Sequence, residues 1–533
     1  MPSSACDYKG CRTRDRTRSW FTAYDSAMVS RHVLALIAPA WGHTLPYIHL
    51  TTRLLASDPE LAVTIVQHNN IVSKMMKELS TCSYDTDRLK IEGVGESDLP
   101  STSATLGKSF AQLSERWLEV LAKAVIPGNT WPKPQTLHMD FFGGLVFDET
   151  RALLGPEGKI LLWCSTLITA CMDQCSEYDF VKIAHEIHAD EERRGGRTME
   201  EVLGDVVCAA NGSDKLDGRV LEIAGGVKIY DHEHQAQGAG STSQFTAVRT
   251  ATQKLTQSVD GIFCPSSIVL EPVTAPFCRD YYEQRGQELF LVGPQMHDDE
   301  WETPAAGPGP SEGRVKTFLD DARKEYGPKS VLYISFGSWF FPVERRHLVE
   351  VMLEVLLSID AVIPFVFVLA GAMASLPEET IDRIHASGRG LVCAHWVDQK
   401  AILKGGTIGW FLTHGGYNSL AEGLSQGIPL IFWPVGAEQG LNAAMLSTGD
   451  RPIGVEFFQI RAGTQLGPSL RPEAPNITGT AEDARAEFEQ VFSDLKGSRG
   501  KTLERNATRI GDLWRQERID GKPVQEITRL ARF

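Results

Sequence analysis

The chain has 533 residues, of which 42% are hydrophobic and 23% are charged, and its formal net charge is −15. This length exceeds what one hydrophobic core usually supports, so we expect at least two domains. The acidic balance argues against a general affinity for nucleic acid or anionic membranes, because counterion release needs a basic face. No segment approaches the ~20 apolar residues that cross a bilayer, and we expect a monomeric, cytoplasmic protein.

The first half of the sequence alternates between strand and helix patterns. Residues 1–27 are polar and basic, and we expect a disordered extension. Residues 32–39 (HVLALIAP) and 61–67 (LAVTIVQ) are typical of buried parallel strands, and 45–55 has helical spacing between them. The alternation continues to 289–293 (LFLVG), which predicts one α/β domain over residues 28–294. The polar, charged stretch 184–250 interrupts it, either as a mobile insertion or as a lid over a substrate.

A second α/β domain follows a change of composition. Residues 303–313 (TPAAGPGPSEG) predict a linker within 295–313. Short apolar runs then recur at 331–336, 364–370, 390–393, 409–413 and 429–433, which predicts a second domain over 314–500. We expect residues 501–533 to be helical and to pack back on the first domain. The predicted fold class is therefore α/β, with two doubly wound sheets, and ligands should bind beyond the carboxyl ends of the strands.

The most informative motif is the segment 409–419 (GWFLTHGGYNS). A buried strand leads into His414 and two glycines, after which Asn418 and Ser419 open a helix. Such a turn brings backbone close to a ligand, and helix N–H groups attract phosphate oxygens. Taken alone, the same residues could also be only a turn and an N-cap.

The surrounding residues 396–439 extend this motif to 44 positions. In length and register the segment resembles the signature of the family 1 UDP-dependent glycosyltransferases, best known from plants. The matching features are the opening Trp, the Gln at the fourth place, the His-Gly and Asn-Ser core, a later Glu and the closing Glu-Gln. This resemblance implies the GT-B fold, in which two Rossmann-like domains face each other across a cleft, with the UDP-sugar bound by the second domain.

The resemblance also implies a role for each matching residue. The nucleoside group consists of Trp396 on the uracil ring, with Gln399 and Glu422 on the ribose hydroxyls. The diphosphate group consists of His414, Asn418, Ser419 and, from a second turn in 335–338 (SFGS), Ser338. The sugar group consists of Glu438 and Gln439. The remaining members of the UDP-sugar-binding set are Val397 and Gly416.

Two positions depart from the plant pattern. Gly405 stands where plant members commonly have His, which we interpret as the loss of a structural contact. Tyr417 replaces the usual Trp before the Asn-Ser pair, so we expect an altered contact to the transferred sugar. The resemblance to the plant members therefore predicts the UDP site of this chain more directly than its sugar preference.

The first domain is expected to supply the catalytic base. In residues 39–46 (PAWGHTLP), His43 follows the first strand and opens the first helix, as the base His does in the family that this chain resembles. His43 could instead be a capping residue, and His49 is a weaker candidate for the base. A base His needs a carboxylate that fixes its tautomer. Asp140, after the short strand 136–139, is our choice of partner, whereas Asp148 is typical of a helix surface.

These residues predict an inverting transfer of a hexose, with glucose expected, from a UDP-sugar to a hydroxyl of a small acceptor. His43 takes the hydroxyl proton while UDP leaves from the opposite face. Fixed donors would receive the charge of UDP, so neither a metal ion nor a cofactor is expected, and Asp298 and Asp299 are interpreted as a solvated pair.

The acceptor is expected to be largely apolar, of phenolic, terpenoid, sterol or polyketide type. The first-domain residues expected to line its site are Phe141, Phe142, Trp117, Trp131 and members of the segment 184–250. Two alternatives remain open at this stage: a non-catalytic UDP-sugar-binding protein, and a hydrolase or epimerase of nucleotide sugars. Donor turnover with and without acceptor distinguishes them.

Overall fold

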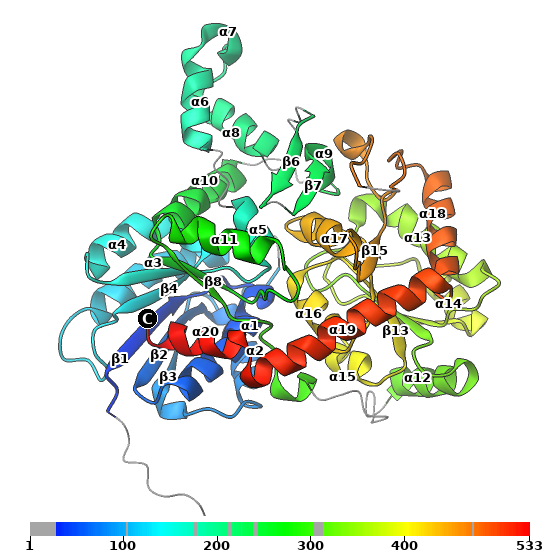
Figure 1. Cartoon of the computed structure of the whole chain (residues 1–533), viewed down its shortest axis with the longest axis horizontal. Coiled ribbons are helices and arrows are strands. Elements are labelled where there is room, and N and C mark those ends of the chain that lie inside the picture. The colour runs from blue at the N-terminus through cyan, green and yellow to red at the C-terminus, as the bar shows by residue number, and fades with distance from the viewer. Residues whose placement is uncertain are drawn as a thin grey trace, which may run out of the picture.

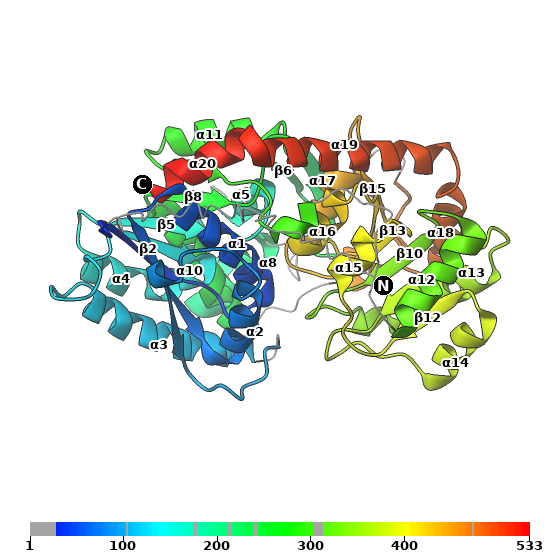
Figure 2. The same cartoon turned by 90° about the horizontal axis from the view of Figure 1, so that it is seen from below.

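The computed structural model describes residues 28–102, 105–174, 179–210, 216, 218–224, 226–237, 243–301, 313–471 and 474–533. The predicted extension 1–27 and residues 303–312 of the predicted linker lie outside these ranges. Within them, the chain forms two halves that lie side by side, each built on a parallel sheet (Figures 1 and 2). The predicted α/β class is confirmed.

The first half contains a seven-stranded sheet in the order β3-β2-β1-β4-β5-β8-β9. Its strands are β1 (Arg31–Leu36), β2 (Leu61–His68), β3 (Leu89–Val94), β4 (Thr136–Asp140), β5 (Lys159–Trp163), β8 (Gly261–Cys264) and β9 (Glu288–Leu291). Its helices are α1 (Trp41–Ser57), α2 (Asn69–Leu79), α3 (Leu106–Ala124), α4 (Phe147–Leu154), α5 (Ile168–Gln174), α10 (Ser243–Ser258) and α11 (Thr274–Glu283).

Both faces of this sheet are buried, which explains the continuous apolar runs in its sequence. Along β1, Leu34 and Leu36 join the cluster under α3, α4 and α11, whereas Val33 and Ala35 join the cluster under α1 and the C-terminal helix. The alternation follows from the two-residue period of a strand. The strand order reverses between β1 and β4, so the loops after these two strands diverge to opposite faces of the sheet and leave a crevice between them.

The second half contains a six-stranded sheet in the order β12-β11-β10-β13-β14-β15, which reverses between β10 and β13. Its strands are β10 (Val331–Ser335), β11 (Phe365–Val368), β12 (Gly390–Cys393), β13 (Ile408–Thr413), β14 (Leu430–Phe432) and β15 (Gly454–Glu456). Its helices are α12 (Gly313–Tyr326), α13 (Arg346–Ser358), α14 (Glu378–Ser387), α15 (Gln399–Lys404), α16 (Tyr417–Ser425), α17 (Gln439–Ser447) and α18 (Ala481–Asp494).

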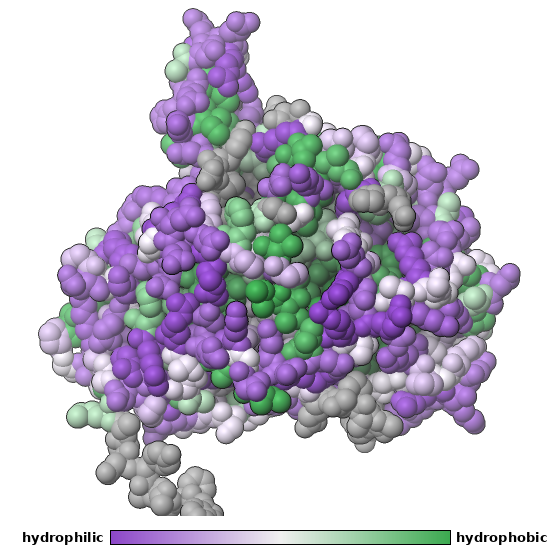
Figure 3. All heavy atoms as spheres, viewed as in Figure 1, coloured by the Kyte–Doolittle hydropathy of each residue, from purple (hydrophilic) through white to green (hydrophobic). Residues whose placement is uncertain are grey.

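The last two helices connect the halves. Helix α19 (Ser498–Asp520) lies along the second half, and α20 (Lys522–Ala531) packs on α1 and β9 of the first (Figure 2). The Trp514 indole N–H donates to the Ser267 hydroxyl at 3.0 Å, and the rings of Phe290 and Phe533 lie 5.4 Å apart. Apolar residues gather on the face of the molecule where the two halves meet (Figure 3).

The segment 184–250 takes two different courses. The helices α6 (Phe180–Ala189), α7 (Glu191–Arg194) and α8 (Met199–Ala210) form an arm that projects from the body (Figure 1). The hairpin of β6 (Val220–Ile223) and β7 (Val227–Tyr230) follows, and then the short helix α9 (Asp231–His234) lies against the second half. The segment 184–250 is thus neither wholly an insertion that projects from the body nor wholly a lid between the halves.

Candidate active site

The two sheets direct their reversal points toward each other. His43 lies in the first turn of α1, after β1, Asp140 is the last residue of β4, and the glycine turn at His414 follows β13. The Asn418 amide, at the start of α16, donates to the carbonyl oxygen of Gly42 at 3.3 Å. The backbone beside His43 therefore touches the helix that was predicted to hold the diphosphate, although these residues are 376 positions apart in sequence.

His43 and Asp140 form a hydrogen-bonded pair. The His43 Nδ1 lies 2.8 Å from the Asp140 Oδ2, and the Asp140 side chain is fully buried while that of His43 is 17% exposed. Asp140 is the last residue of β4, and its other carboxylate oxygen accepts the Phe142 backbone N–H at 3.2 Å. The carboxylate thus orients the imidazole and leaves its Nε2 for a substrate proton.

The surroundings of His43 make it a stronger base. Burial alone lowers the pKa of the imidazole, but the charge and the hydrogen bond of Asp140, with a smaller contribution from Glu438, reverse this effect and raise it. Burial raises the pKa of the Glu438 carboxyl, and the charge of His43 partly offsets this increase. The two groups come from different halves, so their coupling places the His43 pair beside the loop predicted to bind the sugar.

His414 is packed as a neutral ring. Burial lowers its pKa to about 4. A Cβ on Gly337 would lie 2.8 Å from the ring, and one on Gly416 would lie 2.4 Å from it, so both neighbouring turns require glycine. The Phe340 ring stacks against His414 at 5.7 Å between centroids. A neutral imidazole carries one N–H donor, which it can offer to a phosphate oxygen.

The predicted ribose residues are in contact. The Gln399 amide donates to the Glu422 carboxylate at 2.5 Å, and the Tyr333 hydroxyl donates to the Gln399 Oε1 at 3.1 Å. Burial, with the nearby charge of Glu300, raises the pKa of Glu422 to about 7. This carboxyl is therefore partly protonated near neutral pH.

Trp396, predicted to bind uracil, is 55% exposed. The Lys74 ammonium of α2 lies 5.0 Å from the centroid of its ring and 4.0 Å from that of Trp41. Val397 is half-buried beside the core of the second half. One face of the indole thus meets a cation from the opposite half, a contact that sequence reasoning missed.

The remaining predicted residues lie at the starts of α16 and α17 and in the loop after β10. Ser419 is buried in the first turn of α16, and Ser338 is exposed after β10. Glu438 precedes α17. The Gln439 Oε1 accepts the backbone N–H groups of Val435 and Gly436 at 2.9 and 3.1 Å. Gln439 therefore shapes its own loop, and its amide nitrogen is the end that can donate to a sugar hydroxyl.

Comparisons with known proteins place the whole chain among its relatives. Residues 319–461 match the family described as "UDP-glucoronosyl and UDP-glucosyl transferase". The UDP-glycosyltransferase eriJ of Hericium erinaceus is 27% identical over 91% of this chain and 96% of its own length. The chain belongs to the UDP-glycosyltransferase family.

Two further similarities bear on this UDP-glycosyltransferase. A hydroquinone glucosyltransferase of Rauvolfia serpentina is 32% identical over 35% of this chain and 41% of its own length. The structure of Phytolacca americana UGT2 complexed with UDP-2-fluoro-glucose and pterostilbene matches with a TM-score of 0.66 and 19% identity, over 94% of this chain and 99% of that one. The predicted GT-B fold is confirmed.

Tyr417 of this UDP-glycosyltransferase has a role that its sequence position did not indicate. Its side chain is 4% exposed, and its hydroxyl donates to the Pro265 carbonyl of the first half at 2.6 Å. The residue that departs from the plant pattern therefore joins the two halves. Its backbone N–H lies at the start of α16 and interacts with the Glu438 carboxyl.

The aromatic residues expected at the acceptor side divide into two groups. Phe141 and Phe142 flank His43, with ring centroids 5.2 and 5.6 Å from the imidazole. The expectation for Trp117 is wrong, because this residue is fully buried in the core and its indole N–H donates to Thr150. Trp131 packs edge-on against His32 at 5.2 Å.

The structure also shows the surroundings of Asp148, His49 and Asp298, for which the sequence made predictions. Asp148 lies on α4, exposed and paired with Lys254, as predicted. His49 is buried against Glu78. Asp298 is not simply solvated, because Arg53 and Arg518 both pair with its carboxylate.

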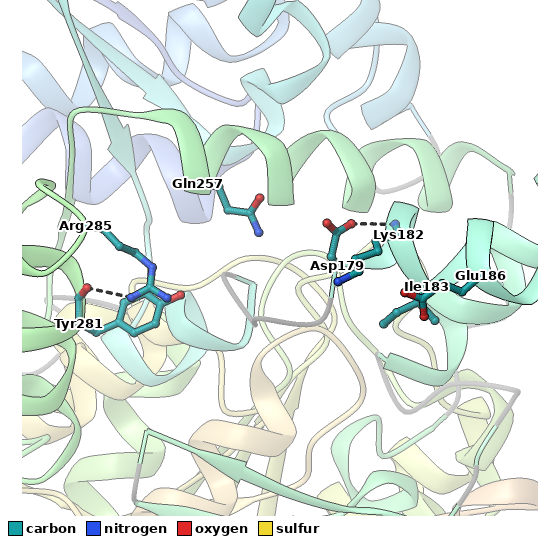
Figure 4. Close-up of a pocket in the computed structure, with 7 residues that line it drawn as sticks. All are labelled: Asp179, Lys182, Ile183, Glu186, Gln257, Tyr281 and Arg285. Atoms are coloured by element: carbon teal, nitrogen blue, oxygen red, sulfur yellow. Dashed lines mark hydrogen bonds between the residues drawn. The ribbon is translucent and has the colours of Figure 1, made fainter.

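A separate pocket of about 520 Å³ lies between α6, α10 and α11, where the Arg285 guanidinium lies 3.5 Å from the centroid of the Tyr281 ring (Figure 4). It shares no lining residue with the predicted donor and catalytic set.

Among the helices that the structure describes, none is long and apolar enough to cross a membrane.

Proposed function

We propose that this UDP-glycosyltransferase transfers glucose from UDP-glucose to a hydroxyl of a small, largely apolar acceptor, with inversion at the anomeric carbon and His43 as the base. The observation that carries the proposal is the position of the His43 and Asp140 pair opposite the His414 turn. A base and a receiver of negative charge on facing elements are what a displacement with inversion requires.

The reaction follows from the two sides of the site. The Nε2 of His43 takes the proton of the acceptor hydroxyl as its oxygen forms a bond to the anomeric carbon. The bond from that carbon to the UDP oxygen breaks on the opposite face, and the imidazolium is stabilised by Asp140. The charge of the departing diphosphate meets His414 and the N–H groups at the start of α16.

We further propose that this transfer needs no metal ion, because neutral donors and a helix N-terminus can receive the charge. Activity that is unchanged by excess EDTA supports this, and activity that is lost and then restored by Mg²⁺ or Mn²⁺ refutes it. A cytoplasmic location and a monomeric state remain predictions, which cell fractionation and light scattering can test.

The acceptor class is argued from the phenylalanines beside His43. Phe141 and Phe142 stack on each other at 4.7 Å, with an angle of 25° between their planes, and form an apolar wall next to the base. Such a wall favours a flat, weakly polar acceptor. Hydroquinone, in the name of one relative, is an acceptor of this kind, and the UDP-2-fluoro-glucose bound to a structural neighbour supports glucose as the sugar.

The decisive experiment replaces His43 with Ala. Glucosyl transfer to a phenolic acceptor should fall below detection by mass spectrometry, while the Kd for UDP in calorimetry stays within about twofold of wild type. His49→Gln tests the rival base. Transfer by the His43→Ala enzyme at near wild-type rate would remove His43 from this role.

The donor and the reaction class are tested together. Hydroxylated acceptors are screened with UDP-glucose, UDP-galactose and UDP-glucuronate, and each donor is also incubated without acceptor. Consumption of donor only when acceptor is present supports a transferase. Equal consumption without acceptor indicates a hydrolase, and UDP binding without any turnover indicates a binding protein.

A further inference from the structure

Residues 230–237, which we name the α9 segment, belong to the first half but contact the second. In Figure 1, β6, β7 and α9 lie beside α17, which begins at the loop carrying Glu438 and Gln439. This loop, residues 434–439, contains the two residues that were predicted to bind the sugar. The α9 segment was part of the stretch that sequence analysis left as either a mobile insertion or a lid.

Buried charges anchor the α9 segment. The Glu233 carboxylate accepts from the Arg471 guanidinium at 3.0 Å and from the Ser469 hydroxyl at 2.5 Å. Arg471 also pairs with Glu456, which in turn pairs with Arg461 at 2.5 Å. All four charged side chains are at most 4% exposed. Two carboxylates and two guanidinium groups balance, so removing one would leave an uncompensated buried charge.

The anchored segment reaches the backbone of the sugar loop. A Cβ on Gly440 would lie 2.3 Å from the carbonyl oxygen of His234, so only glycine permits this approach of the α9 segment to α17. The Gln235 amide donates to the Ala437 carbonyl at 3.2 Å, and Gln235 is 9% exposed. The segment therefore supports the residue immediately before Glu438.

Ala437 is strained. Its φ of 54° lies in the left-handed region, which residues with a Cβ adopt only when surrounding contacts hold them there. On one side of Ala437, the Gln439 side chain holds Val435 and Gly436. On the other side, the α9 segment supplies the bond to the Ala437 carbonyl. Without that bond the strained turn loses the support that the α9 segment gives to the Ala437 carbonyl.

From these contacts we infer that Gln235 is a positioning residue for the transferred sugar, which acts through Ala437 on the Glu438 carboxylate. This inference rests on the proposed function, since it assumes that the loop binds the sugar. The groups assigned to uracil, ribose and diphosphate lie in the loop before α15, on α15 and α16, and in the turns after β10 and β13, all outside the α9 segment. Gln235 should therefore affect the sugar part of UDP-glucose and not the UDP part.

The test compares two affinities in one protein. Gln235→Met keeps the size of the side chain and removes the donor. In calorimetry without acceptor, we expect the Kd for UDP-glucose to rise about tenfold, the effect of one lost hydrogen bond with its strained turn. The Kd for UDP should stay within about twofold. The ratio of the Kd for UDP-galactose to the Kd for UDP-glucose should fall by a similar factor.

Matched variants exclude a general loss of structure. Gln257→Ala removes an exposed glutamine on α10, outside the α9 segment, and should leave both Kd values unchanged (Figure 4). Gln235→Asn shortens the amide by one methylene and should reproduce Gln235→Met if the latter fails to fold. Ala437→Gly removes the steric cost of a positive φ, so Gln235→Met should have a smaller effect in that background.

The outcomes separate the two proposals. An unchanged ratio of UDP-glucose to UDP affinity in Gln235→Met, or an equal weakening of both, overturns the role of Gln235. A wild-type enzyme that transfers no glucose to any acceptor refutes the proposed function instead, whereas the ratio of the two Kd values is measured without turnover.

Discussion

Replacement of Asp140 by Asn is the sharpest test of the catalytic pair. The variant keeps the shape of the side chain and removes the charge that lies 2.8 Å from His43. Two unit charges about 4 Å apart interact by about 4 kcal/mol at an effective dielectric constant of ~20. Because the imidazole is charged only after it takes the proton, this attraction favours the transition state. At ~1.4 kcal/mol for each factor of ten, kcat should fall roughly a thousandfold.

The pH profile of this variant should change in a defined direction. A base must be unprotonated, so wild-type kcat/KM rises with pH through the pKa of His43. Asp140 raises that pKa, whereas burial lowers it. Without the carboxylate only the effect of burial and the weaker effect of Glu438 remain, and the acidic limb of the profile should move to lower pH.

The assay measures kcat/KM for UDP-glucose and a phenolic acceptor between pH 5 and 9 by chromatography, with Asp148→Asn as the matched control. That aspartate is exposed and paired with Lys254, so its variant should resemble wild type. An Asp140→Asn enzyme that retains more than about a tenth of kcat, or whose acidic limb moves to higher pH, would refute the pairing that we derive from the geometry.

Three other predictions address binding and stability. Since the pKa of Glu422 is raised to about 7 and ribose hydroxyls prefer its carboxylate, UDP affinity should increase with pH through 7, and calorimetry at pH 7 should detect proton release that Glu422→Gln abolishes. Tyr417→Phe removes the bond to Pro265, so urea titration should show a free energy of unfolding about 1 kcal/mol lower, with the KM for UDP-glucose unchanged. Burial lowers the pKa of His138 to about 3, below its ordinary 6.5, so the unfolded chain takes up a proton that the folded chain refuses. Between pH 6.5 and about 3, the free energy of unfolding should therefore fall by up to about 1.4 kcal/mol for each pH unit on account of this residue, a slope that equilibrium titrations should find reduced in His138→Gln.

The sequence predicts the strands that carry the site because both faces of each sheet are buried. Residues 61–67 and 390–393 were expected as strands and lie in β2 and β12. Two edge strands, β15 and β3, were not expected. β15 has only three residues, and β3, at one edge, is mostly not fully buried and so lacks a continuous apolar run. Periodicity cannot be recognised over so few residues or without a buried face.

The local sequence pattern also cannot predict contacts between residues that lie far apart in the sequence. The side chain of Tyr417 was expected near the sugar, but its hydroxyl bonds to a residue 152 positions away. Glu233 and Arg471 are 238 positions apart and neither stands in a motif. The residues of the donor segment could be named because their spacing is local, whereas the contacts that join the two halves depend on the tertiary fold.

The chain passes between the halves twice, once between β9 and α12 and again at Gly521, where α19 gives way to α20. The two halves are therefore held together both by the backbone between them and by the packing of α20 on the first half. A single cut by a protease at one crossing leaves the other intact, and the halves remain at high effective concentration for each other. The enzyme should therefore survive nicking between its halves as a functional, non-covalently completed molecule.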